Sequence, residues 1–110
     1  MKKNLYLDDV REVPTEFENF ARSYAQAVAF VEKHGIPSFI SFDHDLGVDA
    51  NGELLPTGYD FAKWLVEIDM DGKYGGFPQD FNFYVHSANP VGKANIESYL
   101  NGYLEHKQKS

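Results

Sequence analysis

The sequence predicts a single small α/β domain over residues 1–110, in which a mainly parallel four-stranded sheet is flanked by helices in three layers. Strand-like apolar runs alternate along the chain with helix-like segments, which is typical of parallel strands joined by right-handed crossovers. A chain of 110 residues can also bury one hydrophobic core, and it leaves little room for a second domain.

Three apolar runs are predicted to be buried strands, and these are Leu5–Leu7, Phe39–Phe42 and Phe81–Val85. The second run is nearly continuous, as expected of a strand that is covered on both faces. The segment 15–22 is ambiguous, because its aromatic residues have helical spacing while the capping pair that starts at Ser23 separates it from the next helix. We interpret part of this segment as a short edge strand.

Three helices are predicted from capping residues followed by apolar residues at helical spacing. Their starts are marked by Ser23 with Gln26, by Thr57 with Asp60, and by Asn89 with Pro90. Gly35 closes the first helix and Gly72 lies near the end of the second. The polar tail, residues 105–110, is predicted to fray.

The composition excludes several function classes. Hydrophobic residues make up 43% of the chain, which is typical of a folded globule. The chain has no cysteine, so disulfides, thiolate catalysis and cysteine-based zinc sites are excluded. A net charge of −7 opposes broad binding to DNA or RNA. No apolar run approaches the ~20 residues of a membrane span or resembles a signal peptide, so we expect a soluble, cytoplasmic protein.

Polar side chains follow each predicted strand at the point where it ends. They are Asp8 and Asp9, then Asp43, His44 and Asp45, and finally His86, Ser87 and Asn89. Because ligands bind at the carboxyl ends of parallel strands, these three groups should converge on one site. Each group alone is also explained by turn and capping roles. Their joint placement at three strand ends favours a functional site.

The residue types at this edge suit phosphate chemistry. The carboxylates of Asp8, Asp9 and Asp43 are suited to a divalent cation, either Mg²⁺ or Mn²⁺. Side chains that would bind phosphate oxygens, together with the helix start behind them, are Arg11, Ser87 and Asn89.

The candidate catalytic residues are Asp43, His44, Asp45 and His86. Asp43 would be a metal ligand or a nucleophile towards phosphorus. The two histidines suit proton transfer because the ordinary pKa of imidazole lies near neutrality. The Asp-x-Asp of residues 43–45 also resembles the haloacid-dehalogenase-like phosphatases, but the lysine and acidic pair of those enzymes do not follow in order.

Four stretches together resemble the cyclic-phosphate processing receiver domains, and they are Leu5–Arg11, Phe39–Gly47, Thr57–Leu65 and Val85–Pro90. The most specific parts are Phe-Asp-His-Asp-Leu-Gly at 42–47 and His-Ser-Ala-Asn-Pro at 86–90. The resemblance runs along nearly the whole chain. It implies a small receiver-like, flavodoxin-like fold, and it supports a strand at Phe17–Ala21.

By the same resemblance, Asp8 and Asp9 match the metal-binding acidic pair of response-regulator receivers, Asp43 the phosphoacceptor position, and Ser87 the hydroxyl near the fourth strand. The sequence departs from those receivers because it has no fifth strand with the receiver lysine. It also adds histidines at positions 44 and 86, which suit acid–base chemistry better than a phosphorelay switch.

The resemblance implies activity on cyclic phosphates of nucleotides or RNA ends. The leading hypothesis is therefore a metal-dependent phosphoesterase that opens such a ring. One alternative is a module that captures a cyclic nucleotide or phosphorylated end without turnover. Another is a protein-interaction domain with an exposed aromatic surface, such as Trp64 or Tyr103.

Overall fold

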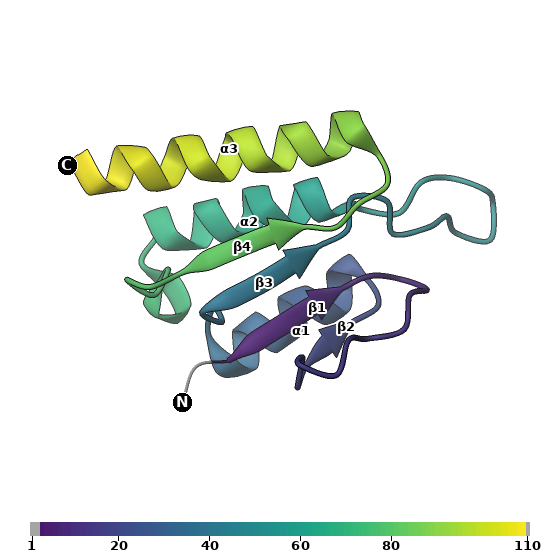
Figure 1. Cartoon of the computed structure of the whole chain (residues 1–110), viewed down its shortest axis with the longest axis horizontal. Helices are drawn as coiled ribbons and strands as arrows, with labels where there is room; N and C mark the ends of the chain where they lie inside the picture. The colour runs from purple at the N-terminus through teal and green to yellow at the C-terminus, as the bar shows by residue number, and fades with distance from the viewer. Residues whose placement is uncertain (1–2, 110) are drawn as a thin grey trace.

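The computed structural model describes residues 3–109, which form one four-stranded parallel sheet with three α-helices (Figure 1). The strands are β1 (Asn4–Leu7), β2 (Phe20–Ala21), β3 (Phe39–Phe42) and β4 (Asn82–Val85). They lie in the order β2-β1-β3-β4, and each neighbouring pair is parallel. The predicted α/β class and parallel sheet are confirmed.

The helices start where the capping residues predict. They are α1 (Tyr24–His34), α2 (Gly58–Met70) and α3 (Pro90–Lys109), with a short 3₁₀ turn η1 (Lys73–Gly75) after α2. The Ser23 hydroxyl accepts from the Gln26 N–H, and Thr57 and Asp60 cap each other reciprocally. The Asn89 side chain accepts from the Gly92 N–H, which caps α3. No helix within residues 3–109 is long and apolar enough to cross a bilayer.

The edge strand exists but is shorter than predicted, because β2 covers Phe20–Ala21 and not the whole of Phe17–Ala21. In the segment before β2, the Asn4 side chain bonds the backbone in place of strand-to-strand hydrogen bonds. Its amide N–H donates to the Glu16 carbonyl, and its amide oxygen accepts from the Glu18 N–H. The ring of Phe17 instead packs on Tyr6, with ring centroids 5.1 Å apart.

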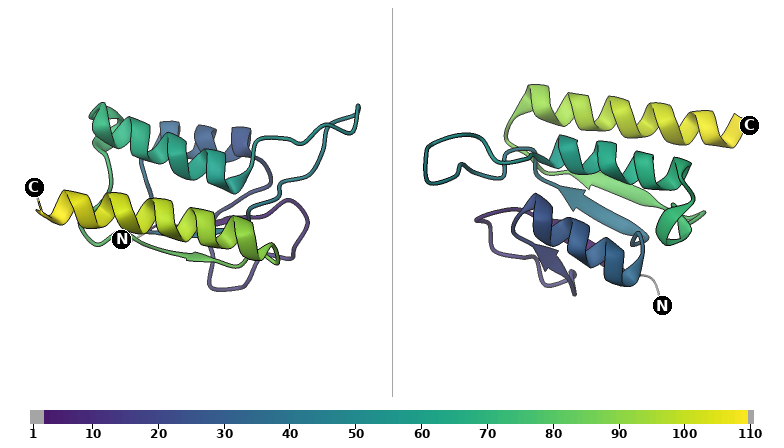
Figure 2. Two further views of the ribbon diagram at one scale, coloured as in Figure 1. Left: turned by 90° about the horizontal axis from the view of Figure 1, so that it is seen from above. Right: turned by 180° about the vertical axis from the view of Figure 1, so that it is seen from behind.

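The three helices lie on one face of the sheet (Figure 2), so the predicted third layer is absent from the described chain. The connections β2–α1–β3 and β3–α2–β4 run in the same direction across the sheet. Right-handed crossovers that run in one direction place their helices on the same face. Only the β1–β2 connection runs the other way, and it contains no helix.

The strand register separates a buried face from an open face. On the helix side, Leu7, Phe42 and Val85 are partners in neighbouring strands and are fully buried. They form the core with apolar residues of all three helices, including Val31, Phe61, Leu65, Ile96 and Leu100. On the opposite face, Tyr6, Ser41 and Tyr84 are partners in one row. The β1–β2 connection covers part of this row through Phe17.

The helix α3 runs to Lys109 and so includes most of the tail, residues 105–110, whose fraying stays a prediction. The Lys107 ammonium lies 2.8 Å from an Asp69 carboxylate oxygen of α2, and this ion pair fixes the last turns against the neighbouring helix. The remainder of the predicted tail, residue 110, lies outside the described residues.

Candidate functional site

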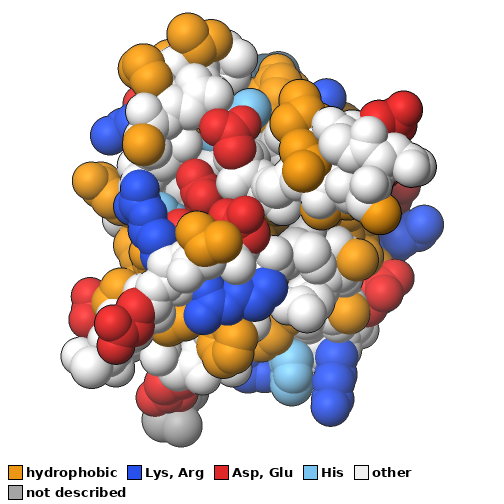
Figure 3. Space-filling view, turned by 90° about the vertical axis from the view of Figure 1, so that its right-hand side faces the viewer, with side chains coloured by type: hydrophobic (Ala, Val, Ile, Leu, Met, Phe, Trp, Pro, Cys, Tyr) orange, Lys and Arg blue, Asp and Glu red, His pale blue; other side chains and the backbone are white. Residues whose placement is uncertain are grey.

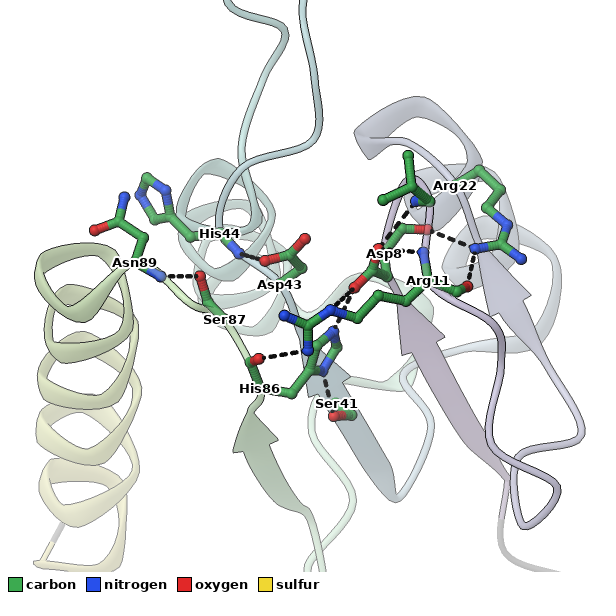
Figure 4. A network of polar contacts seen from close by, with 10 residues as sticks. Asp8, Arg11, Arg22, Ser41, Asp43, His44, His86, Ser87 and Asn89 are labelled. Atoms are coloured by element: carbon green, nitrogen blue, oxygen red, sulfur yellow. Dashed lines mark hydrogen bonds and ion pairs between the residues drawn. The ribbon is translucent and has the colours of Figure 1, made fainter.

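The carboxyl edge of the sheet brings Asp8, Asp43 and His86 together (Figure 4). Each directly follows one member of the Leu7, Phe42 and Val85 register row. The ladder extends past these strands, because the Asp43 N–H donates to the Leu7 carbonyl and the His86 N–H to the Phe42 carbonyl, both at 2.9 Å. One ligand atom from each of the three side chains lies within 4.8 Å of the others. The predicted convergence is thus found for these three residues.

Asp8 is fixed by hydrogen bonds on both carboxylate oxygens, and its side chain is fully buried. Oδ1 accepts from the Val10 and Arg11 N–H groups at 3.0 and 2.9 Å. Oδ2 lies 2.9 Å from His86 Nε2 and 3.5 Å from Arg11 Nε. Burial alone would raise the pKa of Asp8, but these hydrogen bonds outweigh it and hold the pKa below the ordinary value. Asp8 is therefore a preorganised carboxylate.

The His86 ring has a partner at each nitrogen and at one face, and the sequence did not predict these contacts. Its Nε2 faces Asp8, its Nδ1 lies 2.7 Å from the Ser41 hydroxyl, and its ring stacks on Tyr6 with centroids 4.4 Å apart. Both ring nitrogens of His86 therefore already have hydrogen-bond partners in this arrangement. The imidazole orients Asp8 or is available as a metal ligand.

Asp43 has the opposite electrostatic setting from Asp8. Burial and the neighbouring Asp8 carboxylate raise the pKa of Asp43, although the His44 N–H and the Ser87 hydroxyl partly offset them. Two carboxylates at the same edge of the sheet repel each other unless a cation lies between them. Asp43 is therefore the residue whose charge a bound cation would stabilise most.

Two arginines frame the acidic centre. The Arg11 guanidinium donates to the His86 carbonyl at 3.0 Å, and Arg22 donates to the backbone carbonyls of Asp8 and Arg11. Figure 3 looks onto this edge and shows acidic side chains near its centre with Lys or Arg side chains beside them. The Arg11 side chain is 47% exposed, so it can reach an anion as well as Asp8.

A second cluster lies beside the first and joins the β3 end to α3. The ring of His44 points towards Asn89 and away from Asp43 (Figure 4). His44 Nδ1 lies 2.9 Å from Asp45 Oδ1, and the Asn89 amide donates to Asp45 Oδ2 at 3.2 Å. The hydrogen bond from His44 is the main cause that lowers the pKa of Asp45. His44 is therefore oriented by a carboxylate that is itself oriented by an amide.

A family model of the cyclic-phosphate processing receiver domain matches residues 3–102. The chain belongs to this family. A search of curated proteins and a search of solved structures each found no match. The matched span includes both clusters, so the whole polar edge is part of this receiver domain.

The other predicted site residues lie around the edge of this receiver domain. Asp9 is outside the group of Asp8, Asp43 and His86, and its carboxylate faces Gly47, where an added Cβ would lie 3.2 Å from Asp9 Oδ2. The Ser87 hydroxyl accepts from the Asn89 N–H at 3.1 Å, so both residues shape the start of α3. Asn89 is thus an N-cap, which is the simpler of the two roles that its position in the sequence suggests.

The residues that sequence reasoning missed are those that position the site of the receiver domain. A Cβ on Gly58 would lie 1.8 Å from the Asp43 carbonyl oxygen, and one on Gly92 would lie 2.3 Å from the His44 ring. Both glycines therefore allow a helix start to touch the β3 end. Ser41, which holds His86, carried one usable signal, because it is the only polar residue in the run Phe39–Phe42.

Proposed function

We propose that this receiver domain hydrolyses cyclic phosphate esters of nucleotides or RNA ends with the help of a divalent cation. The observation that carries the proposal is the group of Asp8, Asp43 and His86, whose ligand atoms lie within 4.8 Å of one another at the carboxyl edge. This edge is where α/β sheets bind their ligands. Membership of the cyclic-phosphate processing receiver family supports this class of substrate.

The donor set fits a divalent cation. Two carboxylates suit Mg²⁺ or Mn²⁺, and an added imidazole favours Mn²⁺, because Mg²⁺ prefers oxygen ligands. His86 can offer an unprotonated Nε2 only when its proton sits on Nδ1. The Ser41 hydroxyl, 2.7 Å from Nδ1, can accept that proton's hydrogen bond as readily as it can donate one. When bound, the cation would polarise a phosphoryl oxygen and neutralise charge there.

Hydrolysis opens the ring with water as the only co-reactant. The water oxygen forms a bond to phosphorus, and the bond from phosphorus to one ribose oxygen breaks. One proton leaves the water and one is gained by the departing oxygen, so the product is a phosphate monoester beside a free hydroxyl. We assign both proton transfers to His44.

His44 is the better choice because its Nδ1 is bonded to Asp45 while no hydrogen bond within residues 3–109 holds its Nε2. With a proton on Nδ1, Nε2 carries a lone pair that can accept a proton from water. Both nitrogens of His86 are engaged. Arg11, Ser87 and the N–H groups at the start of α3 would bind the phosphoryl oxygens.

The test is turnover of 2′,3′-cyclic AMP by the purified protein with Mn²⁺ or Mg²⁺, followed by ³¹P NMR. Asp43→Asn and His44→Gln should each lower kcat by roughly 100-fold or more. His34→Gln, a histidine at the far end of α1, is the matched control and should retain activity. Absence of turnover with either metal, or full activity of Asp43→Asn, would overturn the proposal.

A non-catalytic capture role is the second candidate, and the engaged nitrogens of His86 favour it. A rigid, fully bonded histidine suits ligand binding without proton transfer. Calorimetry separates the two functions: tight binding of intact 2′,3′-cyclic AMP without any product would support capture, whereas product formation would support hydrolysis.

A further inference from the structure

A hollow of about 270 Å³ lies on the open face of the sheet, next to the polar edge. We call it the Ser41 notch. Its lining residues come from the β1–β2 connection and from β1, β3 and β4, and they are Tyr6, Pro14, Glu16, Phe17, Phe39, Ser41, Tyr84 and His86. No helix covers this face in the described chain (Figure 2), so the notch opens to solvent.

The notch exists because one small residue lies between two large ones. Tyr6, Ser41 and Tyr84 are register partners on β1, β3 and β4. Two strand spacings of ~4.8 Å separate β1 from β4, so about 10 Å lies between the backbones that carry the two tyrosines. Ser41 fills little of this width. The space between the tyrosines is therefore suited to a flat group that enters with its face towards an aromatic ring.

The notch is continuous with the proposed phosphate site. His86 lines the notch and at the same time bonds Asp8, while Ser41 lines it and bonds His86. Two residues along a strand separate the Tyr6 row from the Asp8 row, a distance of ~6.6 Å. A ribose can span this distance, so a single nucleotide could place its phosphate near Asp8 and its base in the Ser41 notch.

The chemistry of the lining favours an uncharged aromatic ring over a second phosphate. Of the described residues that line the notch, none is Lys or Arg, and Glu16 places a carboxylate at its rim. Tyr84, on the edge strand β4, is 55% exposed and so presents aromatic surface to solvent beside the notch. The Lys93 ammonium lies over this ring, 5.4 Å from its centroid, so a base can stack only on the part of the ring that Lys93 does not cover.

We propose that the Ser41 notch binds the base of the nucleotide whose cyclic phosphate is held at Asp8 and Asp43, an inference that rests on the proposed function. The base stacks on Tyr84. Bases stack on aromatic side chains exposed on sheet faces because every base presents a π-face. Substrates of this receiver domain therefore carry a nucleobase, and a cyclic phosphate without a base is bound only through its phosphate.

The experiment compares 2′,3′-cyclic AMP with glycerol 1,2-cyclic phosphate, which lacks a base. Base–aromatic stacking is worth ~1–3 kcal/mol, so Tyr84→Ala should raise KM for the nucleotide by about fivefold or more. Neither kcat nor the KM for the glycerol ester should change. Tyr84→Phe keeps the ring and should restore the nucleotide KM.

Phe20→Ala is the matched control. Phe20 is 56% exposed and belongs to the same register row on the other edge strand, but it does not line the notch. An equal rise in KM with Phe20→Ala, or an equal rise for both substrates with Tyr84→Ala, would overturn the notch assignment and leave hydrolysis intact.

Binding by NMR makes the two proposals separable. If neither compound is turned over, 2′,3′-cyclic AMP should still shift the backbone resonances of Phe39, Ser41 and Tyr84, and Tyr84→Ala should weaken its affinity by about fivefold or more. That result would support the notch while rejecting hydrolysis. A nucleotide that binds without shifting these resonances would reject the notch.

Discussion

His86 Nε2 lies 2.9 Å from Asp8 Oδ2, although the two residues follow strands that are separated in the sheet by β3. The imidazole thus reaches over the end of β3, where Asp43 lies, and ties β4 to β1. Without a cation, this contact helps to lower the pKa of Asp8. The pKa of Asp43 is raised, so its ionised form is the less stable of the two carboxylates.

Loss of the His86 ring should destabilise the fold. His86→Ala removes a hydrogen bond to the buried Asp8 carboxylate, the Ser41 contact and the stacking on Tyr6. We expect the free energy of unfolding to fall by about 2–4 kcal/mol in urea titrations. His106→Ala, at an exposed position late in α3, should stay within about 0.5 kcal/mol of the parent. Equal effects of both variants would contradict the role of His86.

Replacement of Asp43 should stabilise the metal-free protein. Because burial and the Asp8 charge raise the pKa of Asp43, the folded state binds its proton more readily than the unfolded state. Its ionised form therefore lowers stability as the pH rises through the raised pKa. Asn mimics the protonated form and keeps the acceptor for the His44 N–H. Asp43→Asn should raise Tm at pH 7 in EDTA, and a lower Tm would refute this explanation.

The same substitution should weaken cation binding, and Asp9 offers a neighbouring control. Mn²⁺ affinity, followed by calorimetry or paramagnetic line broadening, should fall by about 10-fold or more in Asp43→Asn, the range seen for altered metal ligands and their partners. Asp9→Asn should change it little, because Asp9 lies outside the three-residue group. A larger loss in Asp9→Asn would restore Asp9 as the ligand that the sequence predicts.

Two glycines of the receiver domain should respond to alanine in opposite ways. Gly58→Ala would place Cβ 1.8 Å from the Asp43 carbonyl oxygen, so the start of α2 must move from the β3 end. We expect the free energy of unfolding of Gly58→Ala to fall by about 3 kcal/mol or more. Gly102 lies inside α3, and a Cβ added there would meet open space. Gly102→Ala should therefore raise the free energy of unfolding by about 0.5–1 kcal/mol. Thermal unfolding of both variants tests the pair.

Acid should weaken the packing of α3 on α2 through Asp69. Burial alone would raise the pKa of Asp69, but Lys107, Tyr103 and the Phe77 N–H outweigh it and lower the pKa. Because the pKa of Asp69 is lower in the folded state, its contribution to the free energy of unfolding is complete above about pH 4. This contribution is lost as the pH falls through the folded-state pKa. Asp69→Asn should therefore cost stability at pH 7 and flatten the acid limb of a stability–pH curve. An unchanged acid limb would exclude this role.

The elements of the fold were predictable because their signals are local. Capping residues at Ser23, Thr57 and Asn89 each place a helix start within one residue of the observed position. The apolar runs mark three of the four strands. The edge strand was harder to define, since its pairing depends on the side chain of Asn4, which lies far from it in the sequence.

For the site, the sequence predicted which residues converge but not how their side chains are hydrogen-bonded. Asp8, Asp43 and His86 converge because parallel strands in register must end together. Nothing in the sequence says which nitrogen of a histidine is free, since that depends on contacts such as Ser41 with His86 and Asp45 with His44. The proposed proton-transfer role therefore moves to His44 only once these contacts are known.

By itself the sequence determined the secondary-structure elements, the parallel sheet and the shared edge of the polar clusters, because capping, periodicity and strand polarity are written in neighbouring residues. The tertiary structure alone decided that all three helices lie on one face, because this follows from the order of strands across the sheet and from a β1–β2 connection without a helix. It also decided that two glycines let helix starts approach the site closely, because such distances arise only when separate elements pack.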